Sequence, residues 1–415
     1  MRSSYKKLGS YIRLVDIRNK EGKTDNLLGV STRKVFIESI ANTVGTDFTL
    51  YKVVKRKQFT YVPDTSRRGD KIGIAMLETH DEGLVSQAYT VFEIINHDEL
   101  DPEYLMMWFR RPEFDRYARF KSHGSVREIF DWDEMGDVEL PIPSIDKQRE
   151  IVREYNTIVD RIKLNEQLNK KLEETAQALY KQWFVDFDFP GKNVVFSTSG
   201  YEEFGEIPNE WEVKRLKDIT IKIGSGSTPK GGKDSYQATG TSLIRSMNVF
   251  DFSFGHKGLA FINTAQAKRL DNVAVEVGDV LINITGVSVA RCCVAPESVL
   301  PARVNQHVAI IRLKPDSKLT HYLMSSLCSS AYKNRLLGVS EGGSTRQAIT
   351  KADLEECLIL VPDQAILSDF EFASSSLFAY KSLLIEENEA LKDTLMLLFT
   401  KITKSQNSFD IQKVV

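Results

Sequence analysis

Two short segments of the chain each place a glycine-serine turn beside an arginine. They are Gly124-Ser125-Val126-Arg127 and Gly343-Ser344-Thr345-Arg346. A guanidinium group can bind a phosphate or donate two hydrogen bonds to a guanine edge, and a small turn allows close approach to DNA. Because the pattern occurs twice, we interpret it as a DNA-contacting turn rather than an ordinary solvated loop.

Further polar residues lie in segments rich in glycine, serine and proline, which are typical of loops. Side-chain amides can pair with adenine, and hydroxyl or cationic groups can bind phosphate. The predicted DNA-binding residues are Arg33, Lys34, Arg67, Arg68, Gln87, Ser125, Arg127, Ser227, Thr228, Lys230, Arg245, Asn248, Asn305, Gln306, Ser344 and Arg346. For any one of them, the alternative is a solvated loop residue or a turn-stabilising hydrogen bond.

The sequence contains two segments that are weakly similar to catalytic motifs of nucleotide and DNA enzymes. The segment from Gly226 to Lys233 resembles a phosphate-binding loop, but its spacing is wrong by one residue and Pro229 removes a backbone donor. Asp101-Pro102-Glu103-Tyr104 is weakly similar to the Asp-Pro-Pro-Tyr motif of adenine methyltransferases. No glycine-rich strand-to-helix segment precedes it, and an Asp-Pro pair is typical of a helix N-terminus. Neither segment predicts an enzyme.

Metal-dependent chemistry is not expected either. Pro63-Asp64 is not followed by the acidic-x-Lys triplet of a nuclease site, and the histidines have no ligand-like spacing. His307 is expected to pack or to form hydrogen bonds rather than to bind a metal. The four cysteines form no Cys-x-x-Cys pair, which argues against zinc and disulfides and favours a reducing compartment. We predict a chain without catalytic residues, metal or cofactor of its own.

The composition limits the class of protein. The chain has 415 residues, 42% of them apolar, which suits two ordinary domains rather than one core. Its formal net charge of −2 excludes a globally basic surface, so nucleic-acid contacts must come from local patches. The N-terminus lacks the apolar core of a signal peptide, and no apolar stretch is long enough to span a membrane. We therefore predict a cytoplasmic protein with no membrane partner.

The chain repeats itself at an offset of 219 residues, the interval between Gly124 and Gly343. A period of this length indicates a duplicated domain rather than a solenoid. Three further pairs match at the same offset: Ser86-Gln87 with Asn305-Gln306, Glu134-Met135 with Asp353-Leu354, and Pro143 with Pro362. Tyr104-Leu105-Met106 matches Tyr322-Leu323-Met324 with a slip of one residue, and Gly69-Asp70 matches Gly278-Asp279 with a larger slip.

Each half ends in a long segment with a heptad rhythm of apolar residues and no proline or glycine. A helix of this length with one apolar stripe needs a partner, and the simplest partner is its own duplicate. Two unconnected surface helices are the alternative. The predicted fold is α+β, with mainly-β globular parts at 1–145 and 205–363, helices at 146–184 and 364–403, a linker at 185–204 and a tail at 404–415.

Several segments spread over nearly the whole chain form a specific set. They are Asp146-Lys-Gln-Arg-Glu-Ile151, Ala178-Leu-Tyr-Lys-Gln-Trp-Phe184, Gly205-Glu-Ile-Pro-Asn-Glu-Trp211, Lys214-Arg-Leu-Lys-Asp-Ile219, Gly226-Ser-Thr-Pro229, Ile244-Arg-Ser-Met-Asn-Val249, Val304-Asn-Gln-His307 and Gly343-Ser-Thr-Arg346. With this set the chain resembles the specificity subunit of type I restriction–modification systems. The second half fits this pattern best, whereas the first half lacks the Gly-Ser-Thr-Pro turn and has Leu28-Gly29-Val30-Ser31 instead.

The resemblance implies that each globular part is a target-recognition domain for one half of a split, double-stranded DNA target. It further implies an antiparallel coiled coil that sets the gap between the half-sites. Two modification subunits, which bind S-adenosylmethionine, and restriction/translocase subunits, which use ATP and Mg²⁺, would supply the chemistry. Two alternatives stay open: a coiled-coil scaffold with protein-binding heads, and a DNA methyltransferase or nuclease in its own right.

Overall fold

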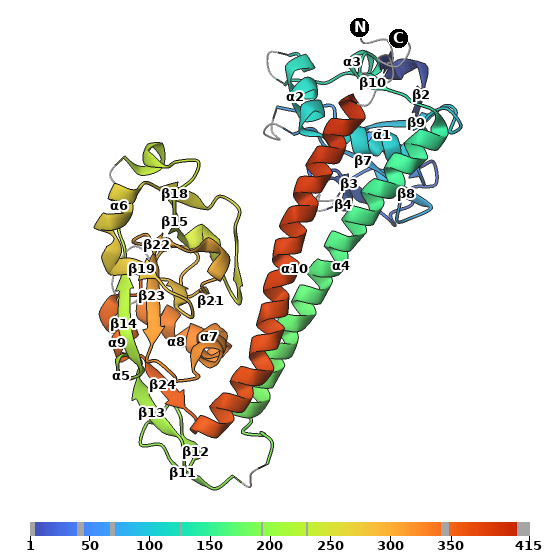
Figure 1. Ribbon diagram of the computed structural model, residues 1–415. Helices are drawn as coiled ribbons and strands as arrows, with labels where there is room; N and C mark the ends of the chain where they lie inside the picture. The colour runs from blue at the N-terminus through green and yellow to red at the C-terminus, as the bar shows by residue number, and fades with distance from the viewer. Residues whose placement is uncertain are drawn as a thin grey trace. The chain divides into compact units, whose positions relative to one another are not determined.

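The computed structural model describes residues 5–39, 45–66, 71–124, 127–191, 194–229, 231–341 and 348–404 (Figure 1). The chain forms two compact units. Unit 1 combines Met1–Ile162 with Ala390–Val415, and unit 2 is Lys163–Glu389. The division therefore falls inside both long helices and not at the predicted linker. Among the described residues, no helix is both long enough and apolar enough to cross a membrane.

The globular part of unit 1, which we call the first head, runs from Tyr5 to Pro141 and surrounds an aromatic core. Phe59, Tyr61, Phe92 and Phe109 are all completely buried in it. Its strands are β1 (Tyr5–Lys7), β2 (Ile12–Val15), β3 (Leu28–Val30), β4 (Phe36–Glu38), β5 (Lys52–Lys55), β6 (Phe59–Tyr61), β7 (Ile74–Met76), β8 (Glu82–Val85), β9 (Thr90–Ile94) and β10 (Glu139–Pro141). Its helices are α1 (Pro102–Phe109), α2 (Pro112–Lys121) and α3 (Trp132–Gly136).

The globular part of unit 2, the second head, runs from Glu206 to Val361. Its strands are β12 (Glu206–Pro208), β13 (Glu212–Arg215), β14 (Thr220–Ser225), β15 (Thr241–Ile244), β16 (Val249–Phe250), β17 (Ser253–Phe254), β18 (Ala260–Ile262), β19 (Ala274–Val275), β20 (Val280–Asn283), β21 (Cys292–Val294), β22 (Ala302–Val304), β23 (Val308–Leu313) and β24 (Leu358–Val361). Its helices are α5 (Leu216–Ile219), α6 (Thr264–Arg269), α7 (Thr320–Cys328), α8 (Ser330–Glu341) and α9 (Lys351–Glu356). The predicted linker contributes β11 (Phe196–Thr198), which pairs with β12.

The two heads share one topology, which we call the frame. The central antiparallel sheet has the order β2-β9-β6-β7 in the first head and β14-β23-β20-β21 in the second. In each head the strand before this sheet pairs with the last strand of the head, as β1 with β10 and β13 with β24. The helices α1, α2 and α3 follow the sheet in the same chain order as α7, α8 and α9. This equivalence confirms the predicted duplication.

One of the predicted matching pairs does not follow the frame. Gly278-Asp279 precede β20, whose equivalent in the first head is β6, and β6 is preceded by Lys57-Gln58. Lys57 and Gly278 both have positive φ, 66° and 85°. The equivalent of Gly278-Asp279 is therefore Lys57-Gln58, and Gly69-Asp70 lie outside the described residues.

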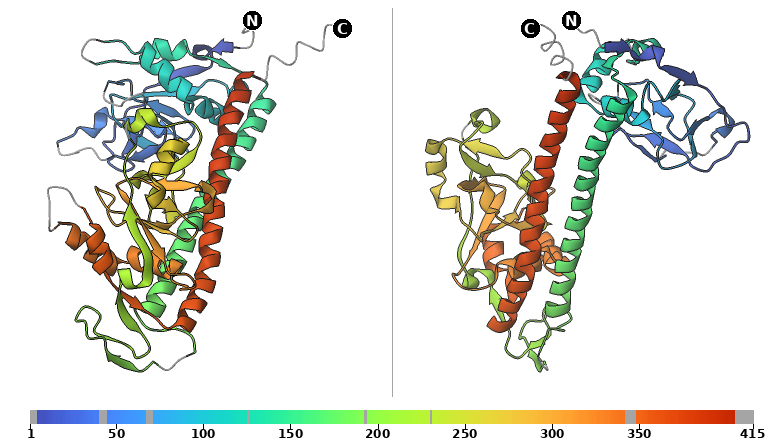
Figure 2. Two further views of the ribbon diagram at one scale, coloured as in Figure 1. Left: turned by 60° about the vertical axis from the view of Figure 1, so that its left-hand side comes forward. Right: turned by 45° about the vertical axis from the view of Figure 1, so that its right-hand side comes forward.

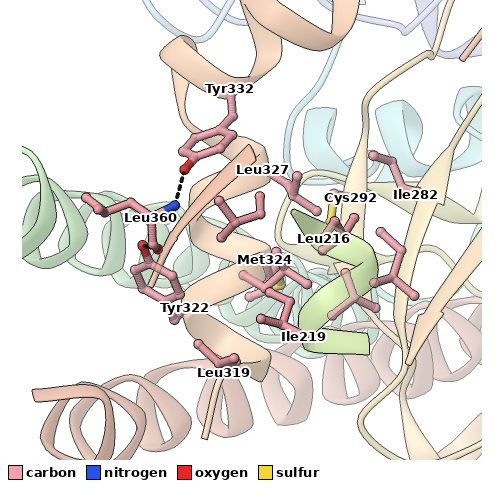
Figure 3. Close-up of a cluster of buried hydrophobic side chains, with 14 of the residues drawn as sticks. Leu216, Ile219, Ile282, Cys292, Leu319, Tyr322, Met324, Leu327, Tyr332 and Leu360 are labelled. Atoms are coloured by element: carbon pink, nitrogen blue, oxygen red, sulfur yellow. Dashed lines mark hydrogen bonds between the residues drawn. The ribbon is translucent and has the colours of Figure 1, made fainter. Parts of the chain in front are cut away.

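A buried tyrosine closes each frame in the same way. The hydroxyl of Tyr104 on α1 donates to the carbonyl of Pro141 at 2.9 Å, and the hydroxyl of Tyr322 on α7 donates to the carbonyl of Leu360. In the second head Tyr332 adds a contact, since its hydroxyl accepts from the backbone N–H of Leu360 at 3.1 Å (Figure 3). Each tyrosine thus fastens a helix to the last strand of its head.

The long helices are α4 (Ile145–Phe184) and α10 (Gln364–Lys404), close to the predicted bounds of 146–184 and 364–403. They run side by side in both views of Figure 2. In unit 1 the rings of Tyr155 and Phe399 are 5.7 Å apart, and in unit 2 those of Trp183 and Phe370 are 5.9 Å apart. Residue numbers rise along α4 as they fall along α10, so the pair is antiparallel. The predicted α+β fold with an antiparallel coiled coil is confirmed.

The heads differ in what is added to the frame. The first head adds two short pairs, β3 with β4 and β5 with β8. The second head instead adds a four-stranded sheet of order β18-β15-β22-β19, with its own apolar core. The additions change the surface of each head while leaving the frame intact.

Candidate nucleic-acid interface

Several strands of the second head end at a common edge. The pairing of Ser225 with Ala309, of Asn283 with Val308 and of Ile244 with Val304 brings these strand ends together. The loops that leave this edge are 226–229, 245–248, 284–287 and 305–307, and we call them the edge loops. They contain six of the predicted DNA-binding residues: Ser227, Thr228, Arg245, Asn248, Asn305 and Gln306.

Gly226 holds two of the edge loops against each other. Its N–H donates to the carbonyl of Asn305 at 3.1 Å. A Cβ atom at this position would lie 1.8 Å from the carbonyl oxygen of Val304, a distance that no side chain tolerates. Close backbone approach therefore explains why a glycine begins the Gly-Ser-Thr-Pro turn.

Four polar side chains from three edge loops form a continuous hydrogen-bonded row, which we call the polar chain. The Thr228 hydroxyl donates to Oε1 of Gln306, and Nε2 of Gln306 lies 3.1 Å from Nε2 of His307. On the other side of the imidazole, Nδ1 of His307 lies 2.5 Å from Oγ1 of Thr285. Thr228 and Gln306 are exposed, so the outer end of the polar chain can reach a ligand. His307 forms hydrogen bonds, as the sequence predicts.

Two predicted contact residues of the second head support loops with their side chains. Asn248 is completely buried, accepts from the N–H of Arg245 at 3.1 Å and donates to the carbonyl of Gly255 at 2.8 Å. The Oδ1 of Asn305, which is 5% exposed, accepts from the N–H of His307 at 3.0 Å. Their amides shape the edge loops, whereas Gln306 presents its amide outward.

Arg245 both supports a loop and remains partly exposed. Its guanidinium packs over the ring of Tyr236, 5.3 Å from the centroid, and donates to the carbonyl of Gly258. The residue is partly exposed. Its guanidinium group is therefore held both by an aromatic ring and by the backbone.

The corresponding edge of the first head carries different groups. Gln87 precedes β9 and is exposed, as is Arg127, which follows the turn at Gly124. Gly124 has a φ of +140°, and a Cβ there would lie 1.9 Å from the carbonyl oxygen of Arg127, so the turn requires glycine. Arg33 is exposed in the turn between β3 and β4.

Lys34, the next residue in this turn, is buried. Its ammonium lies 2.6 Å from Asp115 on α2, and both side chains are at least nine-tenths buried. Burial lowers the pKa of Lys34, although the carboxylate of Asp115 opposes the shift. The pair fastens the β3–β4 turn to α2. This burial is at odds with the predicted DNA contact, and we leave Lys34 out of the proposed interface.

Six predicted contact residues lie outside the described residues: Arg67, Arg68, Ser125, Lys230, Ser344 and Arg346. The described residues around two of these segments pair at the edges of the heads. Asp64 bridges Ile129 in the first head, and Thr285, the inner end of the polar chain, bridges Ala348 in the second.

The described residues include no group of three or more His, Cys, Asp or Glu side chains that could hold a metal ion. Asp101 caps α1, accepting from the N–H groups of Glu103 and Tyr104, with Pro102 at the first turn. Burial raises the pKa of the Cys292 and Cys293 thiols, which disfavours the reactive thiolate.

Comparisons with known proteins agree on one family. No protein-family model matches the chain. The MjaIX type I restriction enzyme specificity subunit of Methanocaldococcus jannaschii is 28% identical over 295 residues, which cover 69% of this chain and 64% of that protein. The HindI specificity subunit of Haemophilus influenzae is 22% identical over 388 residues, which cover 79% and 82%. The chain is a homologue of type I restriction enzyme specificity subunits.

A solved structure supports the fold of this specificity-subunit homologue. The type I restriction–modification S subunit of M. genitalium has a TM-score of 0.57 over 96% of this chain and 95% of that one, at 11% sequence identity. At this identity, the similarity between the two structures concerns the arrangement of their helices and strands. The match to the M. jannaschii subunit leaves about a third of that relative uncovered, since it spans 64% of its length.

Proposed function

We propose that this chain selects the DNA sequence for a type I restriction–modification complex. Each head binds one half of a bipartite double-stranded target, and the α4–α10 pair sets the gap between the half-sites. Spacing between half-sites is a geometric property of the protein that joins them. The observation that carries the proposal is the duplicated frame with two different sets of edge groups, each attached to the same helix pair.

The edge loops supply suitable chemistry for reading DNA. The exposed amide of Gln306 can pair with adenine, and the hydroxyls of Ser227 and Thr228 can bind phosphate. In the first head Gln87 also offers an amide, whereas Arg127 and Arg33 offer guanidinium groups that can bind phosphate or a guanine edge. Two heads with different edges suit a target whose halves differ in sequence.

The chemistry on DNA belongs to partner subunits in this proposal. Two modification subunits bring S-adenosylmethionine and methylate adenine, and restriction/translocase subunits bring ATP and Mg²⁺ for cleavage. The chain itself contributes binding and direction and is not an enzyme.

The test is DNA binding by the complex of this chain with its modification subunits, measured over a range of salt concentrations. We expect binding that weakens with salt, because each neutralised phosphate releases counterions at a log–log slope of about −0.9. Binding that is absent, or insensitive to salt, favours a scaffold with protein-binding heads. Methylation by the chain without partners would place the catalytic site here instead.

A further inference from the structure

A buried polar pair interrupts the apolar seam between α4 and α10. Asn165 is 1% exposed and Asn388 is 5% exposed. The Nδ2 of Asn165 donates to Oδ1 of Asn388 at 2.9 Å and to Oε2 of Glu387 at 2.9 Å. Both residues belong to unit 2, and each occupies a position where a coiled coil normally places an aliphatic side chain.

A second polar pair crosses the same seam. Lys381 is 4% exposed, and its Nζ lies 2.5 Å from Oε2 of Glu173. The ammonium is also 5.9 Å from the centroid of the Phe252 ring. Along α4 the interval from Asn165 to Glu173 is eight residues, and along α10 the interval from Asn388 to Lys381 is seven. Both pairs therefore form in one and the same antiparallel register.

Any slip of the helices by one heptad breaks both pairs. A slip in one direction places Asn165 opposite Leu395 and Lys381 opposite Leu179. A slip in the other direction places Asn388 opposite Ile158 and Asn165 opposite Lys381. In each slipped state a buried amide or ammonium group loses its hydrogen-bond partner, whereas an all-leucine seam would tolerate all three registers.

We propose that the Asn165–Asn388 pair fixes the axial register of the two helices and thereby the length of the gap in the DNA target. The two asparagines are specificity-determining residues for spacing and not for base sequence. The inference rests on the proposed function only in its last step, because the register itself is a property of the protein alone. A slip of one heptad moves one helix along the other by about 10 Å, the length of about three base pairs.

The register is tested first without DNA. In an I158C/L395C variant, the native register places the two cysteines opposite each other, and we expect a disulfide to form readily under mild oxidation. Adding N165L/N388L should lower the disulfide yield at least twofold while leaving the melting temperature unchanged or higher. The matched control is Q167L, an exposed polar-to-leucine change on α4, which should leave the disulfide yield unchanged. An unchanged yield in the N165L/N388L background overturns the register assignment.

Spacing selectivity is then measured with the modification subunits present. DNAs carrying the two half-sites with gaps from three base pairs shorter to three longer are compared in one binding titration. We expect N165L/N388L to bind the altered gaps at least tenfold better than the wild type does, with binding to the native gap retained. Strict selectivity for the native gap in a variant whose disulfide yield has fallen contradicts the link between register and spacing. If the wild type binds no gapped DNA at all, the proposed function fails while the register result stands.

Discussion

The two heads have the same buried frame and different exposed edges. In both heads the four strands of the central sheet follow the same order, and the strand before the sheet pairs with the last strand of the head. In both, a tyrosine hydroxyl donates to a carbonyl of that last strand. At the edge, the second head has the polar chain from Thr228 to Thr285, whereas the first has Gln87 and Arg127 in another setting. The frame is buried and common to both heads, whereas the edge carries exposed polar groups that differ between them.

A pair of equivalent positions shows what the frame requires. In the second head Asp279 accepts from the N–H of Glu276 at 2.7 Å and from Arg312 at 2.8 Å. In the first head Gln58 accepts from the N–H of Lys55 at 2.7 Å and donates to Glu93 at 2.8 Å. Glu93 and Arg312 are separated by the repeat offset of 219. The hydrogen bond from the backbone N–H three residues earlier is the same in both heads. The second bond joins the same two positions but runs in the opposite direction, and the charge of the partner is reversed. The frame therefore needs the contact and not a particular residue.

The strongest test of this equivalence is to replace Asp279 in the second head and Gln58 in the first head by alanine. D279A leaves the Arg312 guanidinium without its buried carboxylate, and we expect a loss of about 3–5 kcal/mol in the unfolding free energy of unit 2. Q58A removes a neutral amide, and the expected loss in unit 1 is about 1–3 kcal/mol. Urea unfolding followed by hydrogen exchange separates the two units. The exposed E206A is the control, and equal losses for the two variants would show that the charge reversal has no energetic consequence.

The two buried tyrosines sharpen the comparison. Y104F and Y322F each leave a buried carbonyl without its hydroxyl donor, and each should cost about 1–3 kcal/mol in its own unit. Their expected costs are similar because the two contacts occupy equivalent places in the frame. A large cost in one unit and none in the other would contradict the equivalence of α1 and α7.

A smaller effect is expected from Glu93, which should make the stability of unit 1 depend on pH. Burial raises the pKa of Glu93, but hydrogen bonds from Gln58 and Arg13 outweigh burial and leave the pKa below its usual value. The stabilisation by Glu93 is therefore present above the unfolded-state pKa and is lost as the pH falls through the folded-state pKa. Arg312 remains protonated throughout. We expect E93Q to reduce the acid sensitivity of unit 1 without changing that of unit 2; the same change in both units would refute the assignment.

Elements with strong periodicity or a repeated motif could be predicted from the sequence. The heptad rhythm predicted α4 and α10 to within a residue or two, and the 219-residue offset predicted two equivalent heads. The pairing of Gly69-Asp70 with Gly278-Asp279 was misplaced, because the order of the sheets and the positive φ angles of Lys57 and Gly278 make Lys57-Gln58 the equivalent pair. The buried ion pair of Lys34 could not be predicted, since its partner Asp115 lies 81 residues away in the sequence.

The candidate interface could be predicted only as a set of residue types. The sequence identified the amides of Asn305 and Gln306, but only the folded structure shows that Asn305 is buried and Gln306 is exposed. His307 also contacts Thr285, which was not among the predicted contact residues. A polar residue next to a strand end is the signal that could have indicated Thr285.

The most direct test of the central claim is a map of methylated adenines in cells that contain this chain and its modification subunits. For the wild type we expect one bipartite motif with a fixed gap. Q306A should relax the sequence of one half of that motif, Q87A should relax only the other half, and the gap should stay the same in both. A single continuous motif, or a change in both halves from either variant, would contradict two heads that read separate half-sites.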